Sequence, residues 1–248
     1  MILLLDIGNT RLKWGWLDGG RLIPGGAISH GDAAADGRAA LPALDPSPAR
    51  ILAANVAGQE IAQSLDQWAA QNCRLRIEYQ RSTRTAAGLR SAYADPESLG
   101  VDRWLAMIGA WRRAPVPFVC IAAGTAVTVD AVDATGQHLG GWILPGQALQ
   151  VESLRRRTAD IERNERRAPA SVLGSFGTST AGAVAEGSWQ ALAAAAGRAV
   201  RHLAGRTGTA PRVYLGGGDA GPILARLDVP AELAPDLVLE GLAVIAGG

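Results

Sequence analysis

A short apolar run at the start of the sequence ends in an acidic residue and a turn of small polar residues. The run MILLLD ends in Asp6, the turn is Gly8-Asn9-Thr10, and Lys13 follows. Such a turn suits a phosphate group, because glycine lets the backbone approach closely while hydroxyl, amide and ammonium groups bind phosphate oxygens. Asp6 is placed to hold Mg²⁺, directly or through water. The alternative interpretation is an ordinary β-hairpin with a polar turn.

Two further turns of this kind occur in the second half of the chain. Gly124-Thr125 follows the apolar run 118–123 and precedes a β-rich run. Later, Gly216-Gly217-Gly218-Asp219 follows another apolar run, and its glycines would let the backbone pass beneath a nucleotide without a side-chain clash. The glycine-rich turn is neither a Walker A nor a GxGxxG sequence, so alone it indicates only a strand–helix turn. Together the three turns favour nucleotide binding.

Similar elements must position these turns in both halves of the chain. Each half starts with three predicted strands joined by turns, and helical sequence follows. The predicted strands are 1–6, 11–17, 21–23 and 51–56, then 118–123, 126–132, 139–144 and 212–215. The predicted helices are 61–71, 97–113, 183–204 and one from about Pro222, with a helix and a loop within 31–50. This repeat predicts an α/β protein of two domains, 1–114 and 115–248, with a ligand in the cleft between them.

Composition excludes several other classes of protein. The 248 residues carry a formal net charge of +1, so we expect neither nucleic acid nor a membrane surface as a partner. Two cysteines cannot form a disulfide framework, and Cys120, within an apolar run, is predicted to be a buried thiol. The first residues do not resemble a signal peptide, so a cytoplasmic location is expected. Lys13 is the single lysine among 24 basic residues.

Seven blocks of sequence, in order along nearly the whole chain, resemble the type III pantothenate kinases. These enzymes belong to the superfamily of acetate and sugar kinases, Hsp70 and actin. The first two blocks together are specific to the family, whereas the turns alone are specific only to the superfamily. The blocks are Asp6–Thr10 with Lys13 and Trp14, Tyr93–Trp104, Gly124–Asp130, Gly140-Gly141 with Pro145-Gly146, Gly177–Thr180 with Gly187, Gly216–Ala220, and Asp236–Leu242.

The resemblance implies two ribonuclease-H-like domains of the actin and Hsp70 type, with the nucleotide in the cleft between them. It implies transfer of the γ-phosphoryl group of ATP to pantothenate, giving 4′-phosphopantothenate for coenzyme A synthesis, with Mg²⁺ and in a homodimer. The ATP-binding residues would be Asp6, Ile7, Gly8, Asn9, Thr10, Arg11, Leu12, Lys13 and Thr125. The pantothenate-binding residues would be Tyr93, Gly100, Val101, Asp102, Arg103 and Thr180.

The resemblance assigns Asp102 as the base that takes the proton of the pantothenate hydroxyl. This agrees with the chemistry, because phosphoryl transfer needs an oxygen nucleophile, charge neutralisation and a proton acceptor. A carboxylate has a reference pKa of ~3.9 and is therefore ionised at neutral pH. Arg103 would bind the substrate carboxylate and keep Asp102 ionised. Without the resemblance, Asp102-Arg103 would be interpreted as an exposed ion pair on a helix.

One residue departs from the family pattern. Ala122 stands where the family usually has an aspartate that helps to bind an activating K⁺ or NH₄⁺ ion. Because alanine offers no side-chain oxygen, either backbone oxygens and Asp130 suffice or the dependence on the cation is weakened. We expect weaker K⁺ activation than in relatives that carry the aspartate.

Rival interpretations remain for the chain and for one of its segments. Another small-molecule kinase of the same fold would keep Asp6, Thr10 and the glycine-rich turns but would not predict the block from Tyr93 to Arg103. A non-catalytic nucleotide-binding regulator would explain Ala122, although Asp6, Asp102 and Thr125 are intact. The arginine-rich segment 155–167 is interpreted as a solvated helix and loop whose acids pair with its arginines, rather than as a nucleic-acid patch.

Overall fold

A computed structural model describes residues 1–30, 47–158 and 173–247. The chain forms two compact units. Unit 1 comprises Met1–Pro115 and Asp236–Gly248, and unit 2 comprises Val116–Pro235. The predicted division into 1–114 and 115–248 differs from this arrangement at the C-terminal end, because the structure groups residues 236–248 with unit 1.

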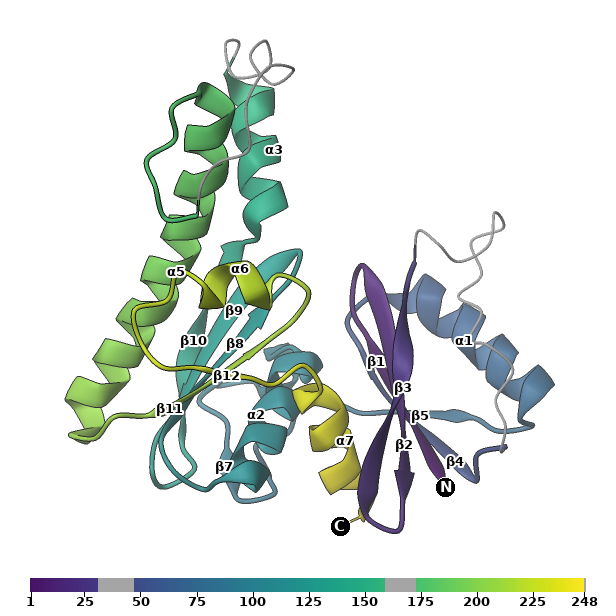
Figure 1. The fold of residues 1–248 in the computed structure, drawn as a ribbon. Coiled ribbons are helices and arrows are strands. Elements are labelled where there is room, and N and C mark those ends of the chain that lie inside the picture. Colours follow the sequence, from purple (N-terminus) through teal and green to yellow (C-terminus); the bar gives the residue numbers. More distant parts are fainter. Residues whose placement is uncertain (31–46, 159–172, 248) are drawn as a thin grey trace. The chain divides into compact units, whose positions relative to one another are not determined.

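Unit 1 is built on a five-stranded sheet with the strand order β3-β2-β1-β4-β5 (Figure 1). β1 pairs antiparallel with β2 and parallel with β4. Alternate side chains of β1 (Leu3, Leu5 and Ile7) pack with α1 in one hydrophobic core, so α1 covers that face of the sheet. The strands are β1 (Ile2–Ile7), β2 (Arg11–Asp18), β3 (Arg21–Ser29), β4 (Arg50–Asn55) and β5 (Ile77–Tyr79), and α1 is Gln59–Asn72.

Two helices from distant parts of the sequence complete unit 1. They are α2 (Val101–Arg113) and α7 (Leu237–Gly247), and between β5 and α2 lie β6 (Thr85–Ala86), β7 (Leu89–Arg90) and the 3₁₀ turn η1 (Pro96–Ser98). Glycines allow the backbones of α2 and α7 to approach closely: a Cβ atom on Gly109 would lie 2.4 Å from the Leu237 carbonyl oxygen. One on Gly241 would lie 2.0 Å from the Leu105 carbonyl oxygen. This packing explains why residues 236–248 belong to unit 1.

Unit 2 repeats the sheet of unit 1, with the strand order β10-β9-β8-β11-β12. Its helix α5 packs on the sheet through Leu192, Ala196 and Leu203, which are at most 1% exposed. The strands are β8 (Phe118–Ala123), β9 (Ala126–Val132), β10 (His138–Pro145), β11 (Arg212–Gly216) and β12 (Glu232–Leu233). The helices are α3 (Gln147–Arg157), α5 (Thr180–Thr207) and α6 (Ala220–Leu224).

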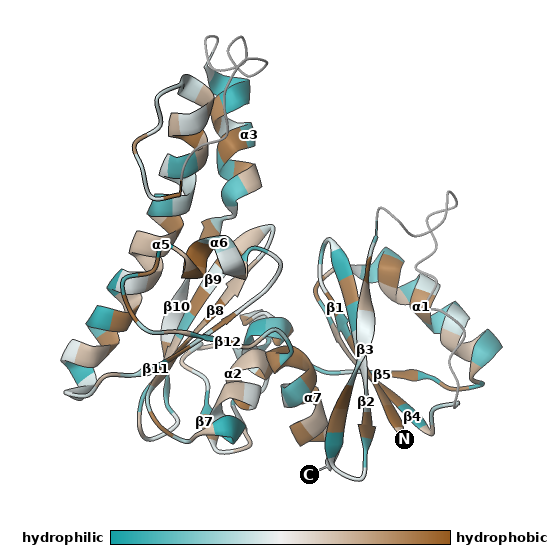
Figure 2. Cartoon of the chain, in the orientation of Figure 1, coloured by the Kyte–Doolittle hydropathy of each residue, from teal (hydrophilic) through white to brown (hydrophobic). Residues whose placement is uncertain are grey.

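Each sheet joins three antiparallel strands to two parallel ones, which is the order of a ribonuclease-H-like domain. The predicted fold class is therefore confirmed. Figure 2 shows that the central strands of both sheets are largely apolar, as expected for strands that are buried on both faces. Cys120 is buried as predicted. In the described part of the chain, no helix is long and apolar enough to span a membrane.

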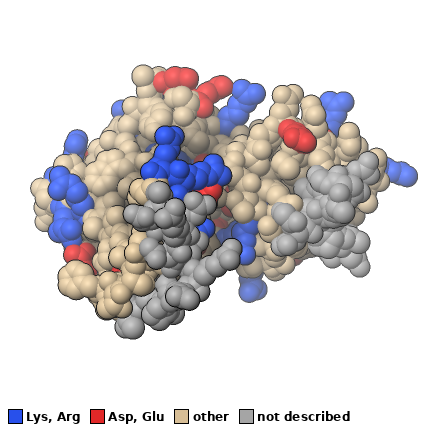
Figure 3. Space-filling view, turned by 90° about the horizontal axis from the view of Figure 1, so that it is seen from above, with Lys and Arg blue, Asp and Glu red and all other residues tan. Residues whose placement is uncertain are grey.

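Two predicted segments lie partly outside the described residues. Most of the helix and loop expected within 31–50 does so, as does the part of the arginine-rich segment 155–167 from residue 159 onward. The described part of the latter ends α3, where Arg156 pairs with Glu152 at 2.6 Å one helical turn away. On the face drawn in Figure 3, basic side chains lie at several separate places, some beside acidic ones.

Candidate active site

The first predicted phosphate hairpin places one acidic and one basic side chain opposite each other. Asp6 near the end of β1 pairs across the ladder with Lys13 of β2, so both side chains lie on the same face of the sheet. This is the face opposite α1. The side chains of Ile7 and Leu12, by contrast, are fully buried in the core. These two residues of the predicted ATP set can therefore reach a ligand only through their backbone.

The turn between β1 and β2 is held by one hydrogen bond within the turn and by two contacts with His30. The amide of Gly8 donates to the carbonyl of Arg11 at 3.0 Å, which closes the turn and leaves Asn9 and Thr10 exposed. His30, directly after β3, contacts it twice: its amide donates to the carbonyl of Thr10 at 2.9 Å, and its Nε2 lies 2.7 Å from the carbonyl oxygen of Gly8. Sequence reasoning assigned no role to His30, because its partners lie about twenty positions earlier in the chain.

Asp102, the predicted base, lies in the first turn of α2. Its Oδ1 accepts a hydrogen bond from the Arg103 amide at 2.8 Å, in keeping with the favourable position of an acidic side chain at a helix N-terminus. Gly100 precedes the helix, and a Cβ atom there would lie 2.7 Å from that same carboxylate oxygen. A larger residue at position 100 would therefore displace Asp102.

Four charged side chains of unit 1 influence one another. Burial raises the pKa of Asp6 to about 7, and repulsion from Asp102 and Asp236 adds to this effect, whereas Lys13 lowers the pKa. Lys13 Nζ also lies 3.8 Å from Asp236 Oδ1. The crossing of α2 and α7 gathers these groups, because Asp102 begins the first helix and Asp236 precedes the second. An electropositive ligand beside Asp6 would relieve the repulsion among the three carboxylates.

Tyr93 and Arg103, both predicted to bind pantothenate, contact each other. Arg103 Nη1 donates to the Tyr93 hydroxyl at 3.1 Å, and the guanidinium lies 5.8 Å from the ring centroid. Arg84 in turn holds the loop by donating to the carbonyls of Tyr93 and Ala94. Arg103 is only 6% exposed, so the interpretation of Asp102-Arg103 as an exposed helical ion pair is wrong.

A cavity of about 320 Å³ opens beside the start of α2. Two residues of the predicted pantothenate set, Gly100 and Val101, line it, whereas Tyr93, Asp102 and Arg103 are not among its lining residues. An ion pair between Arg81 and Glu97 at 3.0 Å lies in its wall. The remaining lining residues are Asn55, Val56, Gln80, Ser82, Ser98 and Leu99.

In unit 2, the turn of the second predicted hairpin makes a close backbone contact with Gly146. The turn Gly124-Thr125 joins β8 to β9, and Thr125 is exposed. The amide of Gly146 donates to the Thr125 carbonyl at 2.9 Å, and a Cβ atom on Gly146 would lie 2.2 Å from the Gly124 carbonyl oxygen. Only glycine fits at position 146, so the turn depends on a residue about twenty positions later in the chain.

The glycine-rich turn of unit 2 packs beside this hairpin. Gly217 has a φ of +96°, and a Cβ atom there would lie 2.0 Å from the Ala123 carbonyl oxygen. The Asp219 amide donates to the same carbonyl at 3.1 Å. The two predicted nucleotide-binding turns of unit 2 are thus brought together. Position 217 requires glycine both because its φ is positive and because a side chain would clash with the Ala123 carbonyl.

Thr180 begins α5 and is exposed, so it is accessible to a ligand. Ser179 caps the helix, its Oγ accepting from the Gly182 amide at 3.1 Å. Glu186, one turn further along, is buried and pairs with Arg226. Sequence reasoning missed this pair, since its two residues are 40 positions apart and neither lies in a recognised motif.

Ala122 in β8 offers no side-chain oxygen that could bind a cation. Its strand neighbours are Thr128 of β9 and Gly216 of β11. Asp130, considered as a substitute cation ligand, is 3% exposed and lies 3.0 Å from the buried Nε2 of His138. Within the described residues, no group of three or more His, Cys, Asp or Glu side chains is arranged to hold a metal ion.

Comparisons with known proteins agree with the predicted family. A model of the type III pantothenate kinase family matches residues 2–202. The chain is 35% identical to a type III pantothenate kinase of Nitrosococcus oceani over 254 residues, covering 99% of this chain and 94% of the relative. It is 38% identical over 247 residues to that of Chromobacterium violaceum, covering 99% of each protein.

Among solved structures, two with low identity share the fold. One is from Campylobacter jejuni and is described as a Baf family transcriptional activator, with 21% identity, a TM-score of 0.57, and coverage of 99% of this chain and 97% of the other. One from Sinorhizobium meliloti, described as a 2-dehydro-3-deoxygalactonokinase, has 14% identity, a TM-score of 0.58, and coverage of 99% and 98%. The fold thus agrees with the sequence relationship, and the chain belongs to the type III pantothenate kinase family.

Proposed function

We propose that this protein transfers the γ-phosphoryl group of ATP to the primary hydroxyl of pantothenate, with Asp102 as the base. The observation that carries this proposal is the grouping of Asp6, Lys13 and Asp102 in unit 1, where their charges act on one another. Phosphoryl transfer relies on positioning and on charge stabilisation around the phosphates, with a carboxylate to take the hydroxyl proton. The start of α2 holds that carboxylate in place through the Arg103 amide.

The hairpin of unit 1 would bind the phosphates of ATP. The exposed Asn9 and Thr10 offer amide and hydroxyl donors, and Lys13 supplies a compact positive charge beside them. His30 fixes the turn through the carbonyls of Gly8 and Thr10. In unit 2, Thr125 would contribute a further donor.

Asp6 fits a role in holding Mg²⁺. Its carboxylate is partly buried and is repelled by Asp102 and Asp236, and a divalent cation would offset this repulsion. Bound Mg²⁺ neutralises phosphate charge as the phosphoryl group is transferred. A site with one direct protein ligand suits Mg²⁺, which usually retains several waters and binds substrate phosphates.

The acceptor would be held by Arg103, Tyr93 and the segment Gly100–Val101 beside the cavity at the start of α2. The Tyr93 hydroxyl and the aromatic ring fix the position of the Arg103 guanidinium, whose positive charge would attract the pantothenate carboxylate. Thr180 of unit 2 would add a hydroxyl. Another small-molecule kinase of this superfamily would not require the contact between Tyr93 and Arg103.

The test is to incubate the pure protein with Mg-ATP and pantothenate and to measure 4′-phosphopantothenate. Asp102→Asn keeps the shape of the side chain but accepts a proton poorly, so kcat should fall by about 10²- to 10⁴-fold. No product from the wild type would contradict the kinase proposal and favour a non-catalytic regulator. Equal rates from both proteins would contradict only the assignment of Asp102 as the base.

The proposed assembly is a homodimer. The cytoplasmic location expected from the sequence is a separate prediction. Support for the dimer comes from exposed apolar side chains of unit 2, such as Ile143 on β10 and Leu149 and Leu154 on α3. Contiguous exposed apolar surface often marks a protein interface. Ile143→Asp should shift the sedimentation coefficient from dimer to monomer, and an unchanged coefficient would exclude this surface from the interface.

A further inference from the structure

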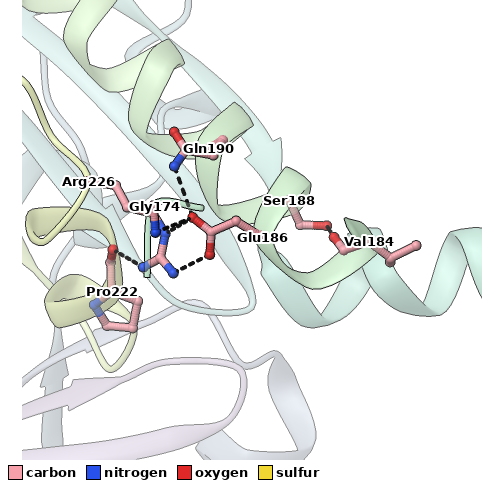
Figure 4. Close-up of polar contacts among 7 residues, drawn as sticks. All are labelled: Gly174, Val184, Glu186, Ser188, Gln190, Pro222 and Arg226. Carbon is pink, nitrogen blue, oxygen red and sulfur yellow. Dashed lines mark hydrogen bonds and ion pairs between the residues drawn. The ribbon is translucent and has the colours of Figure 1, made fainter. Parts of the chain in front are cut away.

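The buried carboxylate of Glu186 in unit 2 connects two segments of the proposed site (Figure 4). One segment leads to Thr180, proposed to bind pantothenate, and the other follows the turn Gly216–Asp219, proposed to bind the nucleotide. Glu186, in the second turn of α5, receives two hydrogen bonds from Arg226, from Nε to Oε1 at 2.8 Å and from Nη2 to Oε2 at 2.5 Å. The two side chains are 5% and 7% exposed. Such a two-pronged contact fixes the orientation of both partners as well as their distance.

The first joined segment leads into the proposed acceptor-binding residue Thr180. The Gly174 amide donates to Glu186 Oε1 at 3.1 Å, which holds the start of the segment against α5. Further along, Gly177 packs so tightly that a Cβ atom there would lie 2.2 Å from the amide nitrogen of Ala183. The segment 174–179 is therefore fixed to α5 at two points before it reaches Thr180.

The second joined segment follows the proposed nucleotide-binding turn. Arg226 Nη1 donates to the carbonyl of Pro222 in α6 at 2.9 Å, and its guanidinium lies 5.9 Å from the ring centroid of Trp189. α6 begins directly after the turn Gly216–Asp219, whose last amide donates to the Ala123 carbonyl at the end of β8. Arg226 therefore ties α6 and the turn before it to α5.

The charge on this pair does not change near neutral pH. The hydrogen bond from Arg226 is the largest of the influences that lower the pKa of Glu186 to about 2. A second ion pair, Arg201 with Asp228 at 2.7 Å, also joins α5 to the segment after α6. Its side chains are 56% and 66% exposed, so solvent weakens it and it provides a natural comparison.

We propose that Glu186 and Arg226 are positioning residues that couple the acceptor segment ending at Thr180 to the nucleotide turn Gly216–Asp219. Binding of ATP at the turn would then be transmitted through α6, Arg226 and Glu186 to the acceptor segment and strengthen pantothenate binding. By linkage, pantothenate would strengthen ATP binding by the same factor. This inference rests on the proposed function of Thr180 and of the turn.

The test compares Glu186→Gln with Asp228→Asn, which removes the exposed carboxylate instead. The KM for pantothenate is measured at low and at saturating Mg-ATP, together with kcat. In the wild type, saturating ATP should lower this KM by about 5-fold or more, which is the usual size of such coupling. Glu186→Gln should abolish the dependence and raise the KM at saturating ATP by the same factor, with a smaller change in kcat. Asp228→Asn should match the wild type.

Several outcomes would overturn the inference. In one, the KM of the wild type does not depend on ATP; in another, Glu186→Gln retains the dependence; in a third, Asp228→Asn loses it to the same extent. If circular dichroism shows that Glu186→Gln is unfolded, Arg226→Lys, which keeps the charge but not the two-pronged contact, replaces it. Unfolding of both variants would show a purely structural role and contradict positioning. Absence of product from the wild type would contradict the proposed function itself, and this inference with it.

Discussion

The hairpins β1–β2 and β8–β9 have the same place in their sheets but carry different chemistry. In unit 1, Asp6 lies one residue before the end of β1 and faces Lys13 across the ladder. In unit 2, Ala122 lies one residue before the end of β8 and faces Thr128. The repeated backbone supplies two turns that can approach phosphate, but only one of them carries a pair of opposite charges.

The surroundings of the two hairpins extend this difference. In unit 1, Asp102 and Asp236 add negative charge around Asp6, and its pKa rises to about 7. In unit 2, the carboxylate two positions along the same face of β9 is Asp130, which is already paired with the buried His138. The acidic group of the first hairpin thus lies near two further carboxylates as well as Lys13, whereas the acidic group near the second is paired with a buried histidine.

Asp6→Ala would remove this contrast by giving the first hairpin the side chain found in the second. We expect kcat/KM to fall by about 10²- to 10³-fold, the usual cost of removing one electrostatic group from such a site. Steady-state kinetics at saturating Mg²⁺ measures the effect. Asp18→Ala, which changes an exposed acid at the other end of β2, is the control and should remain active. A loss below tenfold in Asp6→Ala would show that the two hairpins act alike.

Gly241→Ala tests the close contact between α2 and α7, the two helices whose N-terminal ends bring Asp102 and Asp236 near Asp6 in unit 1. The added methyl group would lie 2.0 Å from the Leu105 carbonyl oxygen, so the helices must separate. We expect the free energy of unfolding to fall by about 1–3 kcal/mol in denaturant titrations. Gly205→Ala in α5 meets no atom within 4 Å and should leave unit 2 as stable or more so. Equal stability of the two variants would contradict the close contact.

Lys13→Arg keeps a positive charge opposite Asp6 but changes the shape of the group that carries it. A planar guanidinium needs more room than a compact ammonium, so we expect the KM for ATP to rise or kcat to fall by about tenfold. Arg21→Lys, at an exposed position at the start of β3 and outside the predicted site, is the exchange in the opposite direction and should leave the kinetics unchanged. Unchanged kinetics in Lys13→Arg would mean that the single lysine of the chain has no special role.

The two units also differ in the direction in which their buried carboxylates are shifted. In unit 2, Arg226 holds the pKa of Glu186 at about 2, below its ordinary value of 4.5. Because the folded-state pKa is lowered, the stabilisation is complete above pH 4.5 and is lost as the pH falls toward 2. Between these values, the free energy of unfolding of Glu186→Gln should depend less on pH, by up to about 1.4 kcal/mol per pH unit. Parallel pH profiles from chemical denaturation would contradict the shift.

Ala122→Asp would make the second hairpin resemble the first, and here we expect the smallest effect. The new carboxylate should strengthen activation by K⁺, which we expect to be weak in the wild type. Turnover is measured over a KCl series at constant ionic strength, with Ala122→Asn as the uncharged control. A steep K⁺ requirement in the wild type would show that the side chain at position 122 is not needed for the cation.

Local sequence predicted most of the architecture. β8 and β9 were predicted with the bounds found in the structure, because an apolar run ends abruptly at a turn of small residues. α2 begins at Val101 rather than at residue 97, since Pro96–Ser98 form a separate 3₁₀ turn. α7 was recognised only as a motif and not as a helix. It is apolar over most of its length (Figure 2), so it lacks the alternation of apolar and polar faces that indicates a surface helix.

The site could be predicted only where its residues lie in short motifs. Asp6 and Lys13 stood out because they flank a turn of small polar residues, whereas Asp102 was assigned only through the family resemblance of the block Tyr93–Trp104. His30 and Glu186 did not stand out, because their roles depend on partners 22 and 40 positions away, which only the folded chain brings near. The pKa of Asp6 likewise depends on Asp236, which lies at the far end of the sequence.

The return of the chain from unit 2 to unit 1 has a consequence for how the protein is made. A ribosome would complete all of Val116–Pro235 before it synthesised α7, which packs on α2 in unit 1. Unit 2 is continuous and can fold as soon as it emerges, whereas unit 1 must wait with the contact surface of α2 uncovered. During synthesis, the nascent chain would therefore hold a folded unit 2 while α2 of unit 1 still lacked its packing partner α7.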